Sequence, residues 1–304
     1  MGSLVGHVLP GLAFFVLGLW HLFKHIKLFS LHPNSYLSSP WFPTSRLRYL
    51  ELLLIIIGSS ISVSAELFIG PAKHQPFDQD GTIPSYHLRN FEHSSISMSF
   101  IVYAAFAIVL DKFGPKAHFS LNLTQLLAAM AFGQQLLLFY LHSTDHQGIE
   151  GHYHFLLQVL VIVSLFTTLI GIGLPGSFLV GFVRSVSILF QGVWFMVMGF
   201  MIWTPEFTPK GCQLRSEDGH RVVRCGSEDA LSRAKSLITL LFSWLVIAVT
   251  ICTVTFYLAL AQSYGKYVEY TYSAVANPKE VEVLQENSRS DVELQRKDGF
   301  IGDD

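Results

Sequence analysis

Seven long apolar segments constrain the fold of this chain more than any other feature of its sequence. They occupy residues 4–23, 49–70, 91–110, 119–141, 153–173, 177–203 and 237–261. About 20 apolar residues let a helix cross the roughly 30 Å hydrocarbon core of a bilayer, and a helix is required because lipid cannot pair exposed backbone groups. We therefore predict an all-α bundle of seven transmembrane helices over residues 1–262, with membrane lipids around it.

The composition agrees with a membrane environment. Of the 304 residues, 51% are hydrophobic and 14% are charged, against roughly 25% charged in a soluble domain. A formal net charge of −2 provides no basic field for nucleic acid, which we exclude as a partner. Residues 263–304 are polar, with more acidic than basic residues, so we expect a disordered cytosolic tail, which either docks protein partners or is only a solvated segment.

Lysine and arginine in the short connections predict the orientation, because cytosolic loops carry more of them. The first and third connections hold the basic residues Lys24, Lys27, Arg46, Arg48, Lys112 and Lys116. The second holds Lys73 and Arg89, and the fourth holds none. This bias predicts a lumenal or extracellular N-terminus and a cytosolic C-terminus. The long sixth connection, about 204–235, is also basic and opposes this orientation, although its length weakens the rule.

Cysteines test the orientation independently. Cys212 and Cys225 both lie in the sixth connection, on the predicted oxidising side, where they either pair as a disulfide or stay as two free thiols. Cys252 lies within the last apolar segment, where we expect a buried apolar side chain.

Ionisable and amide side chains concentrate at the predicted lumenal ends of several helices. They are His7, Glu66, Glu92, His93, Gln134, Gln135, His142, Glu150, His154 and Gln158, with Gln191 in the middle of the sixth segment. An ionisable residue within a span costs about 3 kcal/mol on insertion scales, so it normally faces the bundle interior and is paired or functional. We therefore predict one shared polar site at this rim.

Imidazole and carboxylate are the ligands of zinc and non-haem iron. The predicted metal ligands are His93, His142 and His154, with His7 as a further candidate. Glu66, Glu92 or Glu150 would be a fourth ligand or a general base, and Glu66 and Glu150 are the catalytic candidates. No HExxH motif is present. The alternative is that these histidines form intramembrane hydrogen bonds.

Fewer polar residues lie at the predicted cytosolic ends. His21 and His25 stand four residues apart near Lys24 and Lys27, and we expect them to reach the lipid headgroups. A haem site formed by His21 and His118 is a minor alternative. Glu51 and Arg184 each lie in the cytosolic third of a span, which suggests a buried ion pair between them.

Several sequence pieces carry a family resemblance. They are "GHVLPG" and "GLW" in the first segment, "RLRYLE" and "AELF" around the second, "EHSSISM" at the third, "FYLH" and "EGHYHFLL" across the fourth and fifth, and "RSVSILFQGVWF" in the sixth. In this order they resemble the transmembrane protein 45 family over about residues 1–262. The resemblance implies a seven-span protein of the endomembrane system (Golgi or vesicles) or the plasma membrane. Plant members are labelled viral-response proteins, and no reaction is carried over.

Other seven-span classes fit less well. A retinal protein needs a lysine in its last span, and residues 237–261 contain none. The receptor signatures DRY and NPxxY are absent. Ser94 and Ser95 beside His93 are similar to the membrane zinc hydrolases related to alkaline ceramidases, but the spacing of the other residues differs.

Two hypotheses of function follow. In the first, the lumenal His/Glu site binds a divalent metal and hydrolyses a lipid-like substrate. In the second, the protein is a non-enzymatic trafficking or interaction protein, in stress or viral response, whose histidines serve packing or pH sensing. A proton-coupled transporter is a third possibility.

Overall fold

Helices make up most of the structure, a computed structural model that describes residues 4–69, 74–114, 118–144, 148–217 and 220–276. Within these ranges, seven helices are long and apolar enough to cross a membrane. The long helices are α1 (Leu4–Leu31), α2 (Leu50–Ser64), α3 (Leu88–Phe113), α4 (His118–Thr144), α5 (Ile149–Gly173), α6 (Phe178–Trp203) and α7 (Glu228–Ala276). A π-helical turn, η2 (Ala65–Ile69), continues α2, and short 3-10 turns are η1 (Pro33–Ser35), η3 (Ser85–His87) and η4 (Pro205–Phe207).

The predicted all-α class is confirmed, and each predicted span coincides with one helix. Several helices are longer than their apolar segments: α1 continues to Leu31 and α5 begins at Ile149. Hydropathy marks only the apolar stretch, whereas backbone hydrogen bonding continues through polar turns at its ends. The helix α7 reaches Ala276, within the segment predicted to be a disordered tail from residue 263. Residues 277–304 lie outside the described residues.

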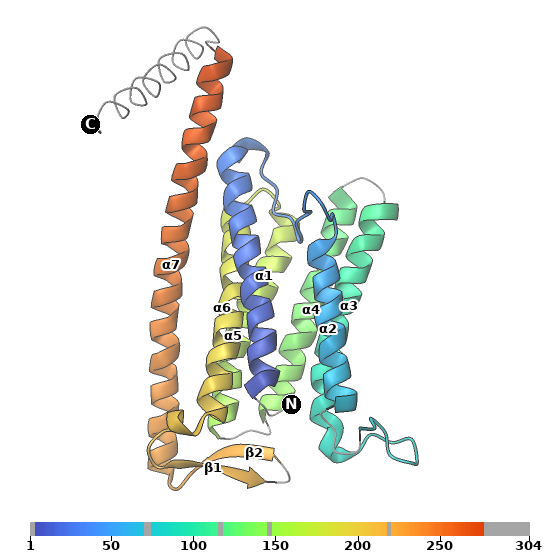
Figure 1. Ribbon diagram of the computed structural model, residues 1–304, viewed down its shortest axis with the longest axis vertical. Helices are drawn as coiled ribbons and strands as arrows, with labels where there is room; N and C mark the ends of the chain where they lie inside the picture. Colours follow the sequence, from blue (N-terminus) through green and yellow to red (C-terminus); the bar gives the residue numbers. More distant parts are fainter. Residues whose placement is uncertain (1–3, 70–73, 115–117, 145–147, 218–219, 277–304) are drawn as a thin grey trace, which may run out of the picture.

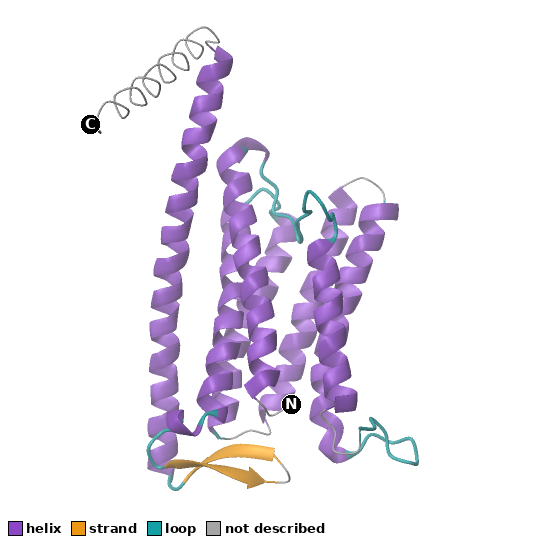
Figure 2. Ribbon diagram, viewed as in Figure 1, coloured by secondary structure: helices purple, strands orange, loops and turns teal. Residues whose placement is uncertain are grey.

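A small β-hairpin between α6 and α7 is an addition that we did not predict. Its strands β1 (Cys212–Glu217) and β2 (His220–Cys225) pair antiparallel, with Cys212 opposite Cys225 (Figure 2). These two cysteines form a disulfide, which settles the alternative that the sequence left open.

The helices form a bundle with two distinct ends (Figure 1). We call one the hairpin end, where the β-hairpin, the start of α1 and the connection between α2 and α3 lie. The other is the loop end, where residues 32–49 connect α1 to α2. Along the bundle, α2 packs on α3, α3 on α4, α4 on α5 and α5 on α6, and α1 returns to pack on α6. The direction of the bundle across a membrane stays a prediction.

Glycines bring α1 and α6 into backbone contact. Gly11 and Gly18 lie seven residues apart on α1, as do Gly192 and Gly199 on α6. A Cβ added to Gly192 would lie 2.6 Å from the carbonyl oxygen of Gly11, and one added to Gly18 would lie 2.5 Å from the Cα of Leu189. Real Cβ atoms essentially never approach another atom within 3.0 Å. Small residues allow this approach where lipid provides no hydrophobic drive for helix association.

The helix α7 lies along one side of the bundle and extends past the loop end (Figure 1). It packs against α1, α5 and α6 with one side, on which Ile238, Val249 and Thr253 are buried. Cys252 lies on this helix as a free, exposed cysteine, so the prediction that it is buried is wrong. The sequence around Cys252 is apolar on all sides of the helix, but only one side of α7 packs against the bundle, and Cys252 is not on that side.

Candidate functional site

Glu66 is a buried carboxylate at the hairpin end. It lies in the π-helical turn after α2 and is 5% exposed. Its Oε2 accepts a 2.7 Å hydrogen bond from Asn90 Nδ2, and its Oε1 lies 3.3 Å from His93 Nδ1. Because Asn90 and His93 lie in the first two turns of α3, these contacts join the end of α2 to the start of α3. The side chain of His93 is 21% exposed, so it is the less buried member of this pair.

His7 and His154 form a second pair at the same end. Their rings meet edge to face with 6.2 Å between centroids, and both side chains are buried. The ring of His7 also lies 4.4 Å from that of Trp203, and the ring of His154 lies 5.9 Å from that of Phe139. His154 Nδ1 donates a 2.9 Å hydrogen bond to the backbone oxygen of Glu150, so its own helix orients the ring.

The predicted metal ligands thus lie at one end but in two pairs. His93 is paired with the catalytic candidate Glu66, and His154 with His7. Among the described residues, no three His, Cys, Asp or Glu side chains are arranged to hold a metal ion.

Two further predicted site residues lie at the junction of α4 and α5. His142 is in the last turn of α4, and its side chain is outside the described residues. Glu150 is in the first turn of α5 and is half-buried, and its backbone oxygen is the acceptor for His154. The zinc or iron site stays a prediction that depends on His142.

Buried polar side chains join α4, α5 and α6 between the two ends. Gln135 Nε2 donates to Gln191 Oε1 at 3.2 Å, and Gln191 Nε2 donates to Ser164 Oγ at 2.7 Å. Ser164 Oγ and Ser187 Oγ lie 2.7 Å apart. Hydrogen bonds between helices hold bundles together in lipid. Gln135, which we assigned to the rim, therefore serves helix packing in the middle of the bundle, beside Gln191.

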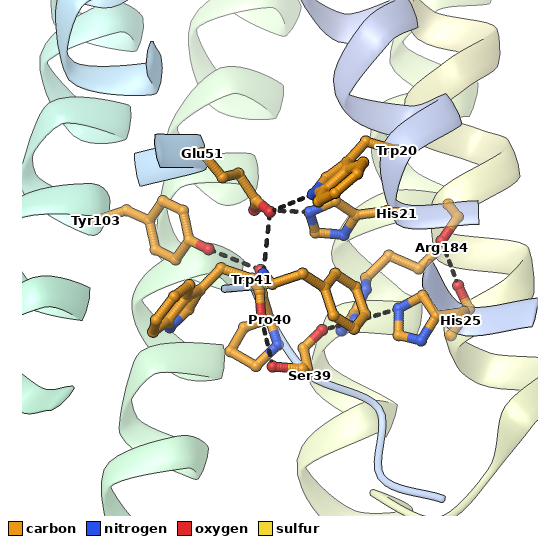
Figure 3. A network of polar contacts seen from close by, with 12 residues as sticks. Trp20, His21, His25, Ser39, Pro40, Trp41, Glu51, Tyr103 and Arg184 are labelled. Carbon is orange, nitrogen blue, oxygen red and sulfur yellow. Dashed lines mark hydrogen bonds and ion pairs between the residues drawn. The ribbon is translucent and has the colours of Figure 1, made fainter. Parts of the chain in front are cut away.

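The most extensive polar network lies at the loop end, where residues of the α1–α2 connection enter the bundle (Figure 3). We call it the loop-end network. It consists of Trp20, His21, His25, Tyr36, Ser38, Ser39, Pro40, Phe42, Glu51, Tyr103 and Arg184. Prolines 40 and 43 keep the entering segment extended, because proline fixes its own φ and restricts the residue before it.

Glu51 organises one side of the loop-end network. Its Oε1 accepts a 2.8 Å hydrogen bond from His21 Nε2, and its Oε2 accepts 3.0 Å hydrogen bonds from Trp20 Nε1 and the backbone N of Phe42. The carboxylate is buried and joins α1, α2 and the loop. Tyr103, from α3, adds a 2.8 Å hydrogen bond from its hydroxyl to the backbone oxygen of Pro40.

Arg184 organises the other side. Its Nη2 donates to the backbone oxygen of Ser39 at 2.7 Å, to Ser38 Oγ at 3.1 Å and to His25 Nε2 at 3.4 Å. A guanidinium only donates, so His25 Nε2 is the acceptor and the imidazole proton is on Nδ1. Nδ1 then donates to Tyr36 Oη, 2.7 Å away. Burial raises the pKa of Tyr36 to about 12, so this oxygen belongs to a neutral hydroxyl.

Two expectations for this end need correction, and a third is not tested. His21 and His25 do not reach the headgroups, because both are at most 4% exposed and are bonded inside the bundle. Glu51 and Arg184 are both buried in the network, but within the described residues Glu51 bonds to His21 and the loop, and Arg184 bonds to the loop. Contacts through the loop therefore replace the direct ion pair. The haem alternative stays a prediction: His21 Nε2 is bonded to Glu51 Oε1, and the side chain of His118 is outside the described residues.

Sequence reasoning missed Tyr36, Ser38 and Ser39 because they lie in a connection without hydropathic or motif signal. The available signal was Arg184, a cation within an apolar segment, which requires buried acceptors from some other part of the chain. The sequence does not say which part supplies them.

A comparison with protein-family models finds a similarity over part of the chain. Residues 121–258, from α4 into α7, match the model described as "Family of unknown function (DUF716)". This range includes Arg184, Gln191 and His154, but excludes His21, Glu51 and Glu66. The chain is therefore similar over residues 121–258 to a family whose description assigns no activity, and its helices are those expected of a multi-pass membrane protein.

Proposed function

We propose that this multi-pass membrane protein senses pH through the contact between Glu66 and His93, as a non-enzymatic trafficking or interaction protein. The observation that carries the proposal is the position of Glu66, a buried carboxylate in a π-helical turn that contacts the amide of Asn90 and the imidazole of His93. Turns of this kind occur frequently at functional sites.

The chemistry follows from the charge of histidine, which ordinarily changes between about pH 5 and 8. A neutral His93 gives Glu66 one hydrogen bond, whereas a protonated His93 forms an ion pair with it across α2 and α3. Hydrogen bonds to charged groups contribute about 1.5–3 kcal/mol. Acidification would therefore tighten the joint between the two helices, and a partner that contacts their connection at residues 74–87 would encounter a different surface.

Hydrogen exchange of the full chain in lipid nanodiscs tests this proposal. After correction for intrinsic exchange rates, amides of residues 65–69 and 88–93 should exchange more slowly at about pH 5.5 than at about pH 7.5, either side of the usual histidine range. His93→Gln should abolish the difference, and His32→Gln, an exposed histidine at the loop end, should keep it. A pH response that survives His93→Gln would refute the assignment.

Metal-dependent hydrolysis is the second candidate. The approach of His7 and His154 at the same end as His93 supports it. Elemental analysis of detergent-purified protein beside a His93→Ala/His154→Ala double variant tests it: stoichiometric zinc or iron that is lost in the variant is expected. A metal-free wild-type protein would remove the hypothesis.

The orientation, compartment and family belong to the same proposal. A lumenal or extracellular hairpin end would place His93 in the compartment whose pH varies, in the endomembrane system or at the plasma membrane. The disulfide at that end supports the orientation, because disulfides persist on the oxidising side. The match over residues 121–258 supports the resemblance to the transmembrane protein 45 family.

A further inference from the structure

The loop end of the bundle is basic, whereas the hairpin end carries both signs of charge. Among the described residues of the loop end, the basic side chains are Lys24, Lys27, Arg46, Arg48 and Lys112, and the acidic ones are Glu51 and Asp111. Both carboxylates are already bonded, Asp111 by Arg48 and Glu51 inside the loop-end network. At the hairpin end, acidic and basic residues alternate over short distances, as in residues 228–235. The described chain therefore leaves most cations of the loop end without a carboxylate.

Two of these cations, Lys24 and Lys27, lie together on α1. Residues three positions apart are neighbours on a helix surface. Lys24 Nζ lies 4.6 Å from the centre of the Trp20 ring, and Trp20 is fixed by the hydrogen bond from its Nε1 to Glu51. Lys27 Nζ lies 5.4 Å from the centre of the Tyr264 ring, on α7. Aromatic rings from two helices therefore hold both ammonium groups at one place beside α1 and α7.

The two lysines lack an anion among the described residues. Like charges on neighbouring positions of a helix destabilise it. Both side chains are half-buried, and within the part of the chain that the structure describes neither ammonium forms a hydrogen bond or an ion pair. An ammonium has three N–H donors and accepts nothing. This pair is therefore suited to an oxygen-rich anion from outside the chain.

The position of the pair along the helices matches the headgroup layer of a membrane. The apolar segments of α1 and α7 end at residues 23 and 261, next to Lys24 and Tyr264. Tryptophan and tyrosine are enriched at membrane–water interfaces, where lysines extend to the headgroups. Nearer the middle of the bundle, the neighbouring surface is apolar and partly exposed at Val16 and Leu260. A ligand that contacts both parts carries a phosphate joined to acyl chains.

We propose that Lys24 and Lys27 bind the phosphate of an anionic phospholipid in the leaflet at the loop end, in contact with α1 and α7. A zwitterionic lipid binds less tightly, because its own cation offsets the phosphate. Since Tyr264 lies past the apolar segment of α7, the bound lipid also stabilises the position of this helix beside α1. The site is at the opposite end of the bundle from the Glu66–His93 contact, so the two proposals stand or fall independently.

Native mass spectrometry of the detergent-purified full chain tests the site, with phosphatidylserine and phosphatidylcholine of the same acyl chains as probes. The wild type should bind phosphatidylserine more tightly than phosphatidylcholine. Lys24→Gln with Lys27→Gln should weaken phosphatidylserine binding roughly 30-fold, about fivefold for each lost charge. Lys24→Arg with Lys27→Arg, which keeps both charges, should retain the binding. Unchanged affinity in the double glutamine variant, or equal binding of the two lipids by the wild type, would overturn the proposal.

Lys112→Gln is the matched control for Lys27→Gln alone. Lys112 also lies at the loop end, and its Nζ is also 5.4 Å from the centre of an aromatic ring, that of Tyr49. Lys27→Gln should weaken phosphatidylserine binding about fivefold, whereas Lys112→Gln should change it far less. An equal effect of the two substitutions would show a diffuse basic field instead of a site and would contradict the proposal.

A competition experiment distinguishes a lipid from free phosphate. Inorganic phosphate in large excess should leave phosphatidylserine bound to the wild type, because it has no acyl chains to contact the apolar surface beside the lysines. Displacement of the lipid by inorganic phosphate would refute the assignment to a phospholipid.

Discussion

Replacement of Gly192 by alanine is the most direct test of how α1 and α6 pack. The new Cβ would lie 2.6 Å from both the Gly11 carbonyl oxygen and the Phe15 Cα, and backbone atoms cannot turn away as a side chain can. To reach the 3.4 Å at which ordinary contact begins, α1 must move by more than about 0.8 Å, because the backbone N of Phe15 lies closer to the new Cβ than either of these atoms. A gap of that size forfeits about a quarter to a half of the dispersion energy of each separated atom pair.

The expected loss is therefore that of an overpacked core, about 1–3 kcal/mol. At roughly 2–4 °C per kcal/mol for a domain of this size, the melting temperature should fall by about 2–12 °C. The assay is thermal denaturation of the detergent-purified full chain, followed by size-exclusion chromatography.

Gly133→Ala is the matched control, because a Cβ there meets nothing within 4 Å in the middle of α4. Alanine is a better helix former than glycine by up to about 1 kcal/mol, so this variant should melt at or slightly above the wild-type temperature. Equal melting of Gly192→Ala and wild type, or an equal loss in both variants, would refute the close-contact account.

Three further predictions concern the loop end and the hairpin. Arg184→Leu should lose about 3–6 kcal/mol, two charged hydrogen bonds at about 1.5–3 kcal/mol each, and a wild-type melting temperature would show that the loop is not held by this residue. Glu51→Gln should lose less, about 1–3 kcal/mol, because the amide oxygen still accepts hydrogen bonds while the charge-assisted contact with His21 is lost; no loss in the same assay would show that the carboxylate charge is dispensable. Cys212→Ser with Cys225→Ser removes a cross-link across 13 residues, worth about 3 kcal/mol in the chain-entropy model. Because this disulfide closes only the hairpin, proteolysis of the hairpin should accelerate while the bundle keeps its melting temperature. A lower melting temperature of the bundle in this variant would contradict the separation.

The sequence predicted the helices well because lipid imposes a simple rule on them. A span must be apolar and about 20 residues long, so hydropathy alone locates α1 to α7. The hairpin was missed because its strands are short and polar. Asp218 and Gly219 between the strands are a typical turn signal, and this pair was available in the sequence.

The candidate site was only partly predictable. The His93 contact with Glu66 and the approach of His7 to His154 follow the prediction of polar residues at one rim. The sequence could not reveal which helices pack together, and that packing decides the contacts of the loop-end network. Because α1 packs on α6, His25 meets Arg184 inside the bundle, although the local sequence around His25 is typical of a headgroup-facing helix end.

The α1–α2 loop also has a consequence for biosynthesis. Arg184 bonds to Ser38 and Ser39 across 146 and 145 residues of chain. At about 5–20 residues per second, a ribosome needs roughly 7–30 s to make that distance. During this interval the glycine side of α1 and its polar loop are made without α6, the helix that packs on α1 and donates to the loop. The helix α1 is thus synthesised first but packs against its partner late. A nascent chain that stalls before α6 therefore leaves α1 without the helix on which it packs.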